Sequence, residues 1–176
     1  MDNKTCGKLH DFALVKEDAS RVVVSYGLTD TGKDELYTWY EIYFYKKQGM
    51  PTFAMAKDAM LNDVNERTDQ KILSGFVWDG QPVWLSSENQ FNFKAAYDLA
   101  VQSKGKTLPV TFKIGEDENE NPIYHTFEAM DEFTDFYTSA IGYVNACLTD
   151  GWNEKDSIDF EEYKQFFPEE NRANDK

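Results

Sequence analysis

The stretch Phe76-Val-Trp-Asp-Gly-Gln-Pro-Val-Trp-Leu-Ser-Ser-Glu-Asn-Gln90 predicts a tight β-hairpin that leads directly into a helix. Asp79-Gly80 suits the positive φ of a two-residue turn, and aromatic and β-branched residues flank it on both sides. Ser87 and Gln90 have the spacing of a capping box, in which the hydroxyl accepts a backbone N–H and the amide reaches back. The predicted hairpin and cap consist of Trp78, Asp79, Gly80, Trp84, Ser87 and Gln90. These residues define a fold and offer no nucleophile, base or metal ligand set.

The composition indicates a folded and strongly acidic protein. The 176 residues include 13 Phe, 10 Tyr and 4 Trp, which argues against intrinsic disorder. Lys and Arg number 18 against 32 Asp and Glu, for a net charge of -14. This sign disfavours binding to nucleic acid through phosphates. The acidity serves solubility in one interpretation, and mimicry of DNA against a basic enzyme groove in the other.

The cysteines and the apolar segments limit the class of protein further. Cys6 and Cys147 have no metal-ligand spacing, and a buried free thiol at Cys147 is the commoner outcome, although a disulfide stays open. Residues 1–10 lack a signal-peptide core, and no segment has the apolar length of a membrane span. We therefore expect a protein without a membrane partner that stays in a cytosol until it is assembled or released.

The N-terminal 50 residues predict an aromatic β-hairpin. Residues 20–26 and 36–45 are rich in β-branched and aromatic side chains, and a long loop joins them. Both faces of the second strand are aromatic, so either helices cover both faces or one face binds a partner. The candidate partner-binding residues lie on one of these faces: Tyr37, Trp39, Tyr43 and Tyr45.

The rest of the chain predicts alternating helices and hairpin strands. Helices are expected at 52–73, 88–103, 128–148 and 160–167, and strands at 108–114 and 123–127. The same periodicity predicts that Phe91, Ala95, Ala96, Leu99 and Ala100 face the core and that Asp63 lies on a solvated face. Asp150-Gly151 is expected to end the third helix. Asp159 with Glu162 is the expected cap of the last helix. The fold class is therefore α+β, with antiparallel hairpins packed with three to four helices in a single compact domain. Its parts are an extension at 1–50, a domain at 51–168 and a polar tail at 169–176.

The sequence contains two acidic segments that resemble calcium loops. Residues 117–128 place Asp, Asn, Asn and Glu at EF-hand positions 1, 3, 5 and 12, but Pro122 replaces the turn glycine. Residues 151–162 match only the second half of such a loop. His10 and His125 form no zinc pair, and no catalytic motif is present. We expect no enzyme activity, no cofactor and no metal site, with a calcium-binding module as an alternative.

Residues 73–152 resemble an uncharacterised phage and prophage domain found in tail-fibre and tail-fibre-assembly proteins. The resemblance is carried by Asp79-Gly80, Val83-Trp84, Gln90, Ala96, Ala100, Phe112-Lys113, Pro122-Ile-Tyr124 and the helix from Glu128. The version in this chain is most similar to those of phages of gut Bacteroides-type hosts, which share the aromatic segment at 39–44. It implies a hairpin, a helix, a short strand and a second helix, and no catalytic residue.

The resemblance implies a non-enzymatic virion or assembly protein, associated with the tail, that binds another phage protein through the aromatic hairpin. Such a protein would be located in the virion, and in the host cytoplasm during assembly, where it could also oligomerise. The alternative function is an acidic inhibitor or DNA mimic that acts on a host defence or nucleic-acid enzyme.

Overall fold

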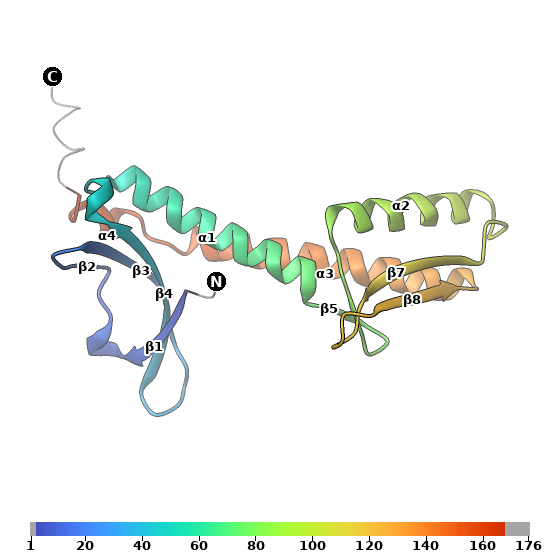
Figure 1. Cartoon of the computed structure of the whole chain (residues 1–176), viewed down its shortest axis with the longest axis horizontal. Coiled ribbons are helices and arrows are strands. Elements are labelled where there is room, and N and C mark those ends of the chain that lie inside the picture. Colours follow the sequence, from blue (N-terminus) through green and yellow to red (C-terminus); the bar gives the residue numbers. More distant parts are fainter. Residues whose placement is uncertain (1–2, 168–176) are drawn as a thin grey trace, which may run out of the picture. The chain divides into compact units, whose positions relative to one another are not determined.

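The computed structural model describes residues 3–167 and confirms the α+β class with antiparallel hairpins (Figure 1). The chain divides into two compact units. The first comprises the described residues up to 65 together with those from 152 onward, and the second comprises residues 66–151. The boundary predicted at residue 50 stays a prediction. The predicted tail at 169–176, and Pro168 before it, lie outside the described residues.

The first unit is built on a four-stranded antiparallel sheet with strand order β1-β4-β3-β2. Its strands are β1 (Lys4–Lys8), β2 (Val15–Glu17), β3 (Arg21–Asp30) and β4 (Leu36–Tyr45), with 3₁₀ turns at Leu9–Asp11 and Lys46–Gln48. The predicted hairpin is the β3–β4 pair, in which Val24 lies opposite Ile42. The sequence prediction lacked β1 and β2, which extend this hairpin on both sides.

Helix α1 (Phe53–Ser74) and the short helix α4 (Glu161–Lys164) supply the apolar cover for the inner face of this sheet. The core of the unit consists of Val22, Val24, Tyr26, Ala56, Met60, Val64, Tyr163 and Phe167. The buried residues of α1, Ala56, Met60 and Val64, recur at helical spacing, as an amphipathic helix requires. The prediction for Asp63 is wrong, because this carboxylate is buried and accepts hydrogen bonds from the Tyr26 hydroxyl and the Asn3 amide. A buried carboxylate needs such donors to offset the loss of water.

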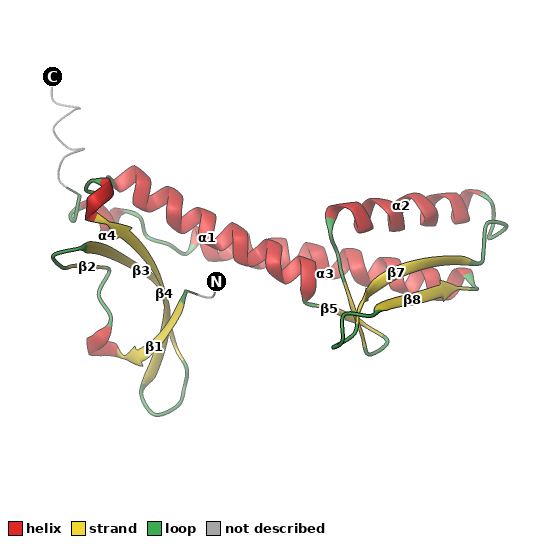
Figure 2. Ribbon diagram, in the orientation of Figure 1, coloured by secondary structure: helices red, strands yellow, loops and turns green. Residues whose placement is uncertain are grey.

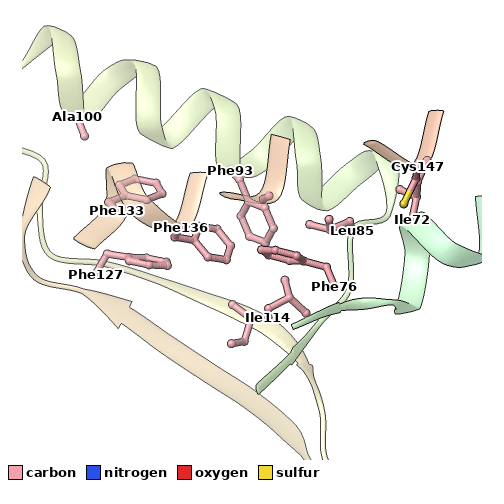
Figure 3. Close-up of a cluster of buried hydrophobic side chains, with 12 residues drawn as sticks. Ile72, Phe76, Leu85, Phe93, Ala100, Ile114, Phe127, Phe133, Phe136 and Cys147 are labelled. Atoms are coloured by element: carbon pink, nitrogen blue, oxygen red, sulfur yellow. The ribbon is translucent and has the colours of Figure 1, made fainter. Parts of the chain in front are cut away.

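The second unit packs α2 (Ser87–Gln102) and α3 (Met130–Asp156) with two hairpins. The hairpins are β5 (Phe76–Trp78) with β6 (Gln81–Val83), and β7 (Val110–Glu116) with β8 (Pro122–Phe127). Figure 2 shows α2 running along the β7–β8 hairpin. Between them lies an aromatic core (Figure 3), in which Phe127 stacks on Phe133 at 4.7 Å and Phe93 meets Phe136 edge-on at 5.0 Å.

The opening hairpin is confirmed, and its helix cap is corrected by one residue. Asp79 and Gly80 have φ of 48° and 73°, as a two-residue hairpin turn requires. The cap is Ser86 and not Ser87, because the Ser86 hydroxyl accepts the Asn89 N–H at 3.2 Å. Gln90 instead donates its side-chain amide to the Leu85 carbonyl at 2.7 Å.

Helix α2 buries a different face from the one predicted. Phe93 and Ala100 are buried and Ala96 packs partly on the core, whereas Phe91 and Leu99 are 71% and 54% exposed. Ala95 is exposed as well. The helix is apolar on two sides, so its periodicity did not determine which side the β7–β8 hairpin would cover.

Helix α3 continues through Gly151, where the sequence predicted its end. A Cβ at Gly151 would lie 2.5 Å from Oγ1 of Thr68 in α1, so this glycine permits close helix packing in place of a turn. The predicted cap of the last helix is confirmed in part. Asp159 accepts the Glu161 N–H at 3.0 Å, as a capping residue does, and Phe160 between them already has helical dihedrals, while α4 spans Glu161–Lys164.

Candidate functional site

The candidate site is the face of the four-stranded sheet that points away from α1, called here the outer face. Side chains alternate along a strand, so Tyr40, Ile42 and Phe44 pack into the core while their neighbours point outward. The four predicted partner-binding residues, Tyr37, Trp39, Tyr43 and Tyr45, share this outward parity. The strand pairing places Tyr43 opposite Val23, and Tyr45 opposite Arg21.

Trp39 does not belong to the exposed surface, which corrects one of the predicted binding residues. Its side chain is 2% exposed because the N-terminal segment covers it. Phe12 meets its ring edge-on at 5.7 Å, and a Cβ at Gly7 would lie 2.8 Å from the indole. The covering segment includes β1, which the sequence prediction lacked, and Gly7 is the residue that leaves room for the indole.

Glu41 connects the buried and the exposed aromatic residues of the outer face. One carboxylate oxygen accepts the Trp39 indole N–H at 2.9 Å, and the other accepts the Tyr43 hydroxyl at 2.5 Å. Because Trp39 is packed tightly, the carboxylate is held in place and in turn orients the Tyr43 ring. Sequence reasoning did not identify Glu41. Its position between two aromatic residues of the same parity, Trp39 and Tyr43, was the available signal.

The titration behaviour of this pair follows from the same contacts. Burial raises the pKa of Glu41. The hydrogen bonds from Tyr43 and Trp39, together with the charge of Lys16, lower the pKa by more than burial raises it, so the net shift is downward. The hydrogen bond to Glu41 raises the pKa of the Tyr43 phenol, and burial adds to this effect. Both groups therefore keep their ordinary charge near neutral pH.

Two tyrosines of the predicted set remain well exposed, Tyr43 at 41% and Tyr45 at 50%. Tyr37 is half-buried. The guanidinium carbon of Arg21 lies 5.1 Å from the Tyr43 ring centre, and the Lys47 ammonium lies 5.9 Å from that of Tyr45. We call Tyr43, Tyr45, Arg21 and Lys47 the tyrosine patch. It combines aromatic and cationic groups on a chain whose net charge is -14.

The histidine and tryptophan of the second unit that the sequence singled out, His125 and Trp78, make local contacts with acidic residues. His125 Nε2 lies 2.9 Å from Glu132, beside Trp78, whose indole donates to Asp135 at 3.1 Å. Within residues 3–167, no three His, Cys, Asp or Glu side chains gather in a way that could hold a metal ion. Both cysteines are free, and Cys147 is buried as expected. The described part of the chain has no helix suited to crossing a membrane.

The two calcium-like segments adopt other structures. Asp117 accepts the backbone N–H groups of Asn119 and Asn121 at 2.8 and 2.9 Å, so its carboxylate stabilises the β7–β8 turn. These bonds hold the pKa of Asp117 below its ordinary value, with the Asn121 side chain as the largest cause. Residues 151–156 are helical, so the second segment does not form the loop of an EF-hand.

A shallow groove in the second unit has a volume of about 480 Å³. Its apolar lining comes from Ile72, Leu73, Leu85, Val144 and Leu148, and polar side chains such as Asp69 and Gln90 stand at its rim. The lining also includes the hydroxyls of Ser86 and Ser87, of which Ser86 caps α2, and it contains no histidine, cysteine or lysine.

Comparisons with known proteins identify a family. The search of curated proteins and the search of solved structures found no match. The model of a family described as a domain of unknown function (DUF4376) matches residues 55–170. These residues include the whole stretch 73–152 on which the resemblance to an uncharacterised domain rests, and they make up more than half of the chain. The chain therefore belongs to this family of domains of unknown function.

Proposed function

We propose that this chain is a non-enzymatic component of a phage particle or of its assembly, associated with the tail, and that it binds another phage protein through the tyrosine patch. The resemblance of residues 73–152 to tail-fibre and tail-fibre-assembly proteins supplies the phage context. The exposed pair Tyr43 and Tyr45 on a sheet is the observation that carries the binding role.

The chemistry of the patch supports binding to a protein. Tyrosine buries a large area at little cost in side-chain entropy, and it leaves a hydroxyl for a hydrogen bond. Glu41 already orients Tyr43, so less order has to be created when a partner binds. Lys47 beside Tyr45 favours a partner that places a carboxylate at this end of the patch, whereas the charge of Arg21 is already paired with Asp18 at 3.1 Å.

The size of the patch limits the mode of binding. A stable interface buries about 800 Å² on each partner, which is more than two tyrosines can supply. The partner would therefore also contact β2, which is the edge strand nearest Arg21 in the strand order. Addition of a strand to such an edge would use the unpaired backbone groups of β2.

The first test is mass spectrometry of purified phage particles and of assembly intermediates. We expect the chain in at least one of these preparations, and its absence from both would refute the phage role.

The second test examines the patch itself. Candidate partner proteins from neighbouring genes are bound to the wild type and to Tyr43→Ala/Tyr45→Ala, with Tyr124→Ala as the control because Tyr124 is 64% exposed in the other unit. We expect the double variant to lose binding and the control to retain it. Equal binding by all three proteins would refute the patch while leaving the phage role to the first test.

A further inference from the structure

We propose that the groove of the second unit is a binding site for an amphipathic amine, that is, a small molecule with one ammonium group on an apolar body. The groove is lined by the end of α1, by the segment that leads into α2, and by α3. All of its lining residues lie between 69 and 148, so the groove belongs entirely to this unit. The tyrosine patch belongs to the first unit, so this site is additional to the one proposed above.

The floor of the groove is apolar and is held in place by the core. Leu85 and Ile72 are buried members of the core (Figure 3), and Val144 and Leu148 pack against it. Because the core holds these side chains, the groove needs little rearrangement to accept an apolar group. Its volume of about 480 Å³ lies within the range of roughly 300–1,000 Å³ that is usual for small-molecule sites. The size and the floor therefore fit the apolar body of a small ligand.

A small cavity of about 10 Å³ extends the apolar side of the groove. The groove and the cavity share Leu85, Gln90 and Val144 in their linings. The cavity then continues between α2 and α3, where it is lined by Phe93, Tyr137, Ala140 and Ile141. This volume gives room for about one small group such as a methyl. The apolar end of a ligand would therefore point toward the space between α2 and α3.

Asp69 is the one ionisable residue among the described residues that line the groove. It lies away from the small cavity, because α1 packs along α3 with Thr68 beside Gly151, near the end of α3 remote from that cavity. Within the described part of the chain, no hydrogen bond or ion pair uses the Asp69 carboxylate, and the nearby Lys71 pairs with Asp150 at 3.4 Å. The carboxylate is therefore available to a cation on the ligand, and the Gln70 carboxamide beside it in the lining offers a further acceptor.

The start of α2 also borders the groove, and a helix N-terminus favours anions. The protein itself already uses this preference, because Glu88 lies in the first turn and the Ser86 hydroxyl accepts the Asn89 N–H. The net charge of -14 attracts a cation and repels an anion within roughly 10 Å at 0.1 M salt. Charge therefore favours an amine over an acid with the same apolar body.

Titration of the full chain with phenylbutylamine, followed by NMR spectra of the backbone amides, tests the site. Phenylbutyrate is the matched ligand, because it has a similar apolar body and carries a carboxylate in place of the ammonium group. With the amine we expect saturable shifts below about 10 mM at amides within residues 69–73, 85–90 and 144–148. The acid should bind at least about tenfold more weakly.

Two substitutions that remove one negative charge separate the groove from the overall charge of the chain. Asp69→Asn should weaken binding of the amine by about three- to tenfold, because it removes the only charged group of the lining. Glu118→Gln, in the turn between β7 and β8, should leave the affinity within about twofold of the wild type, because screening limits its effect on the groove. Both side chains are exposed, so neither change disturbs the core. Leu73→Gln should weaken the binding of amine and acid alike, since it removes apolar surface from the groove.

Four results would each overturn the proposal. The first is the lack of a saturable shift with the amine, and the second is a set of shifts that lies outside the three lining segments. The third is an acid that binds as tightly as the amine, which would exclude recognition of the ammonium group. The fourth is an equal loss of affinity in Asp69→Asn and Glu118→Gln, which would assign the attraction to the net charge and not to the groove.

Discussion

Replacement of Glu41 by Gln tests how the outer face of the first unit is held together. Glutamine keeps the shape of the side chain but provides one acceptor oxygen where the carboxylate provides two. The buried Trp39 indole has the stronger need for an acceptor, because an unsatisfied buried N–H is costly. We therefore expect Glu41→Gln to retain the bond from Trp39 and to replace the charge-assisted 2.5 Å bond from the Tyr43 hydroxyl by a weaker neutral bond, in which the amide nitrogen donates to the phenol oxygen.

The expected change in the free energy of unfolding depends on how exposed the contact between residue 41 and the Tyr43 hydroxyl is. Hydrogen bonds to a charged group contribute about 1.5–3 kcal/mol when buried, and solvent screening reduces this at a partly exposed site. Because Tyr43 is 41% exposed, we expect the free energy of unfolding of the first unit to fall by about 1 kcal/mol at neutral pH.

The loss should depend on pH in a defined direction. The folded-state pKa of Glu41 lies below its ordinary value of 4.5. The carboxylate therefore contributes stability that is fully present above the pKa of the unfolded state and is lost as the pH falls through the folded pKa. Since glutamine does not titrate, the difference between wild type and variant should be full at neutral pH and should shrink in acid.

Urea unfolding followed by NMR signals of β3 and β4 amides measures the first unit separately from the second. Glu35→Gln is the matched control, because its carboxylate is 91% exposed and lies 3.8 Å from Lys8, which predicts a change of only a few tenths of a kcal/mol. A Glu41→Gln effect that is absent, or that is equal at about pH 7 and about pH 3, would refute the role of the carboxylate.

Three further predictions concern single contacts. Ser86→Ala should cost about 1 kcal/mol through loss of the α2 cap, while Ser87→Ala should change little; equal thermal stability of the two variants would contradict the assigned cap. Gly151→Ala should destabilise by about 1–3 kcal/mol because its Cβ meets a threonine of α1, whereas Gly142→Ala, in open space on the same helix, should gain about 0.5–1 kcal/mol. The reverse order in urea unfolding would contradict close packing at residue 151. Burial raises the pKa of Tyr163 to about 12, so its contribution is present below the ordinary value of 10 and is lost as the pH rises toward 12. Tyr163→Phe should cost about 1 kcal/mol at neutral pH through the lost hydroxyl bond and should flatten the alkaline part of the stability profile, and an unchanged profile would contradict this assignment.

The elements predicted correctly are those that depend on local backbone preferences. The Asp79-Gly80 turn, the β3–β4 hairpin and helix α1 each follow from residues close together in sequence. The exposure of the candidate binding residues was predicted in part, and their role in binding stays a prediction. Tyr43 and Tyr45 lie on the exposed face as their parity indicated, and the same parity placed Trp39 beside them.

The predictions that failed concern contacts between distant segments. Trp39 is buried because residues 4–12 fold over it, and no pattern within β4 carries that information. Asp63 looked solvated from the helix periodicity, but it lies within reach of the Tyr26 hydroxyl from the sheet. Glycine is common at helix ends, which is why the sequence predicted an end at Gly151. In the structure the absence of a side chain at Gly151 lets Thr68 of α1 pack closely against α3.

By itself, the sequence determined the α+β class, the position of the Asp79-Gly80 hairpin and the acidic character, since these follow from local dihedral preferences, periodicity and charge count. Only the tertiary structure decided which of two apolar faces of α2 is buried, and which aromatic residues of β4 stay exposed. Both choices depend on which segment packs against each face, because the favourable free energy of burial arises only when that segment removes the apolar surface from water.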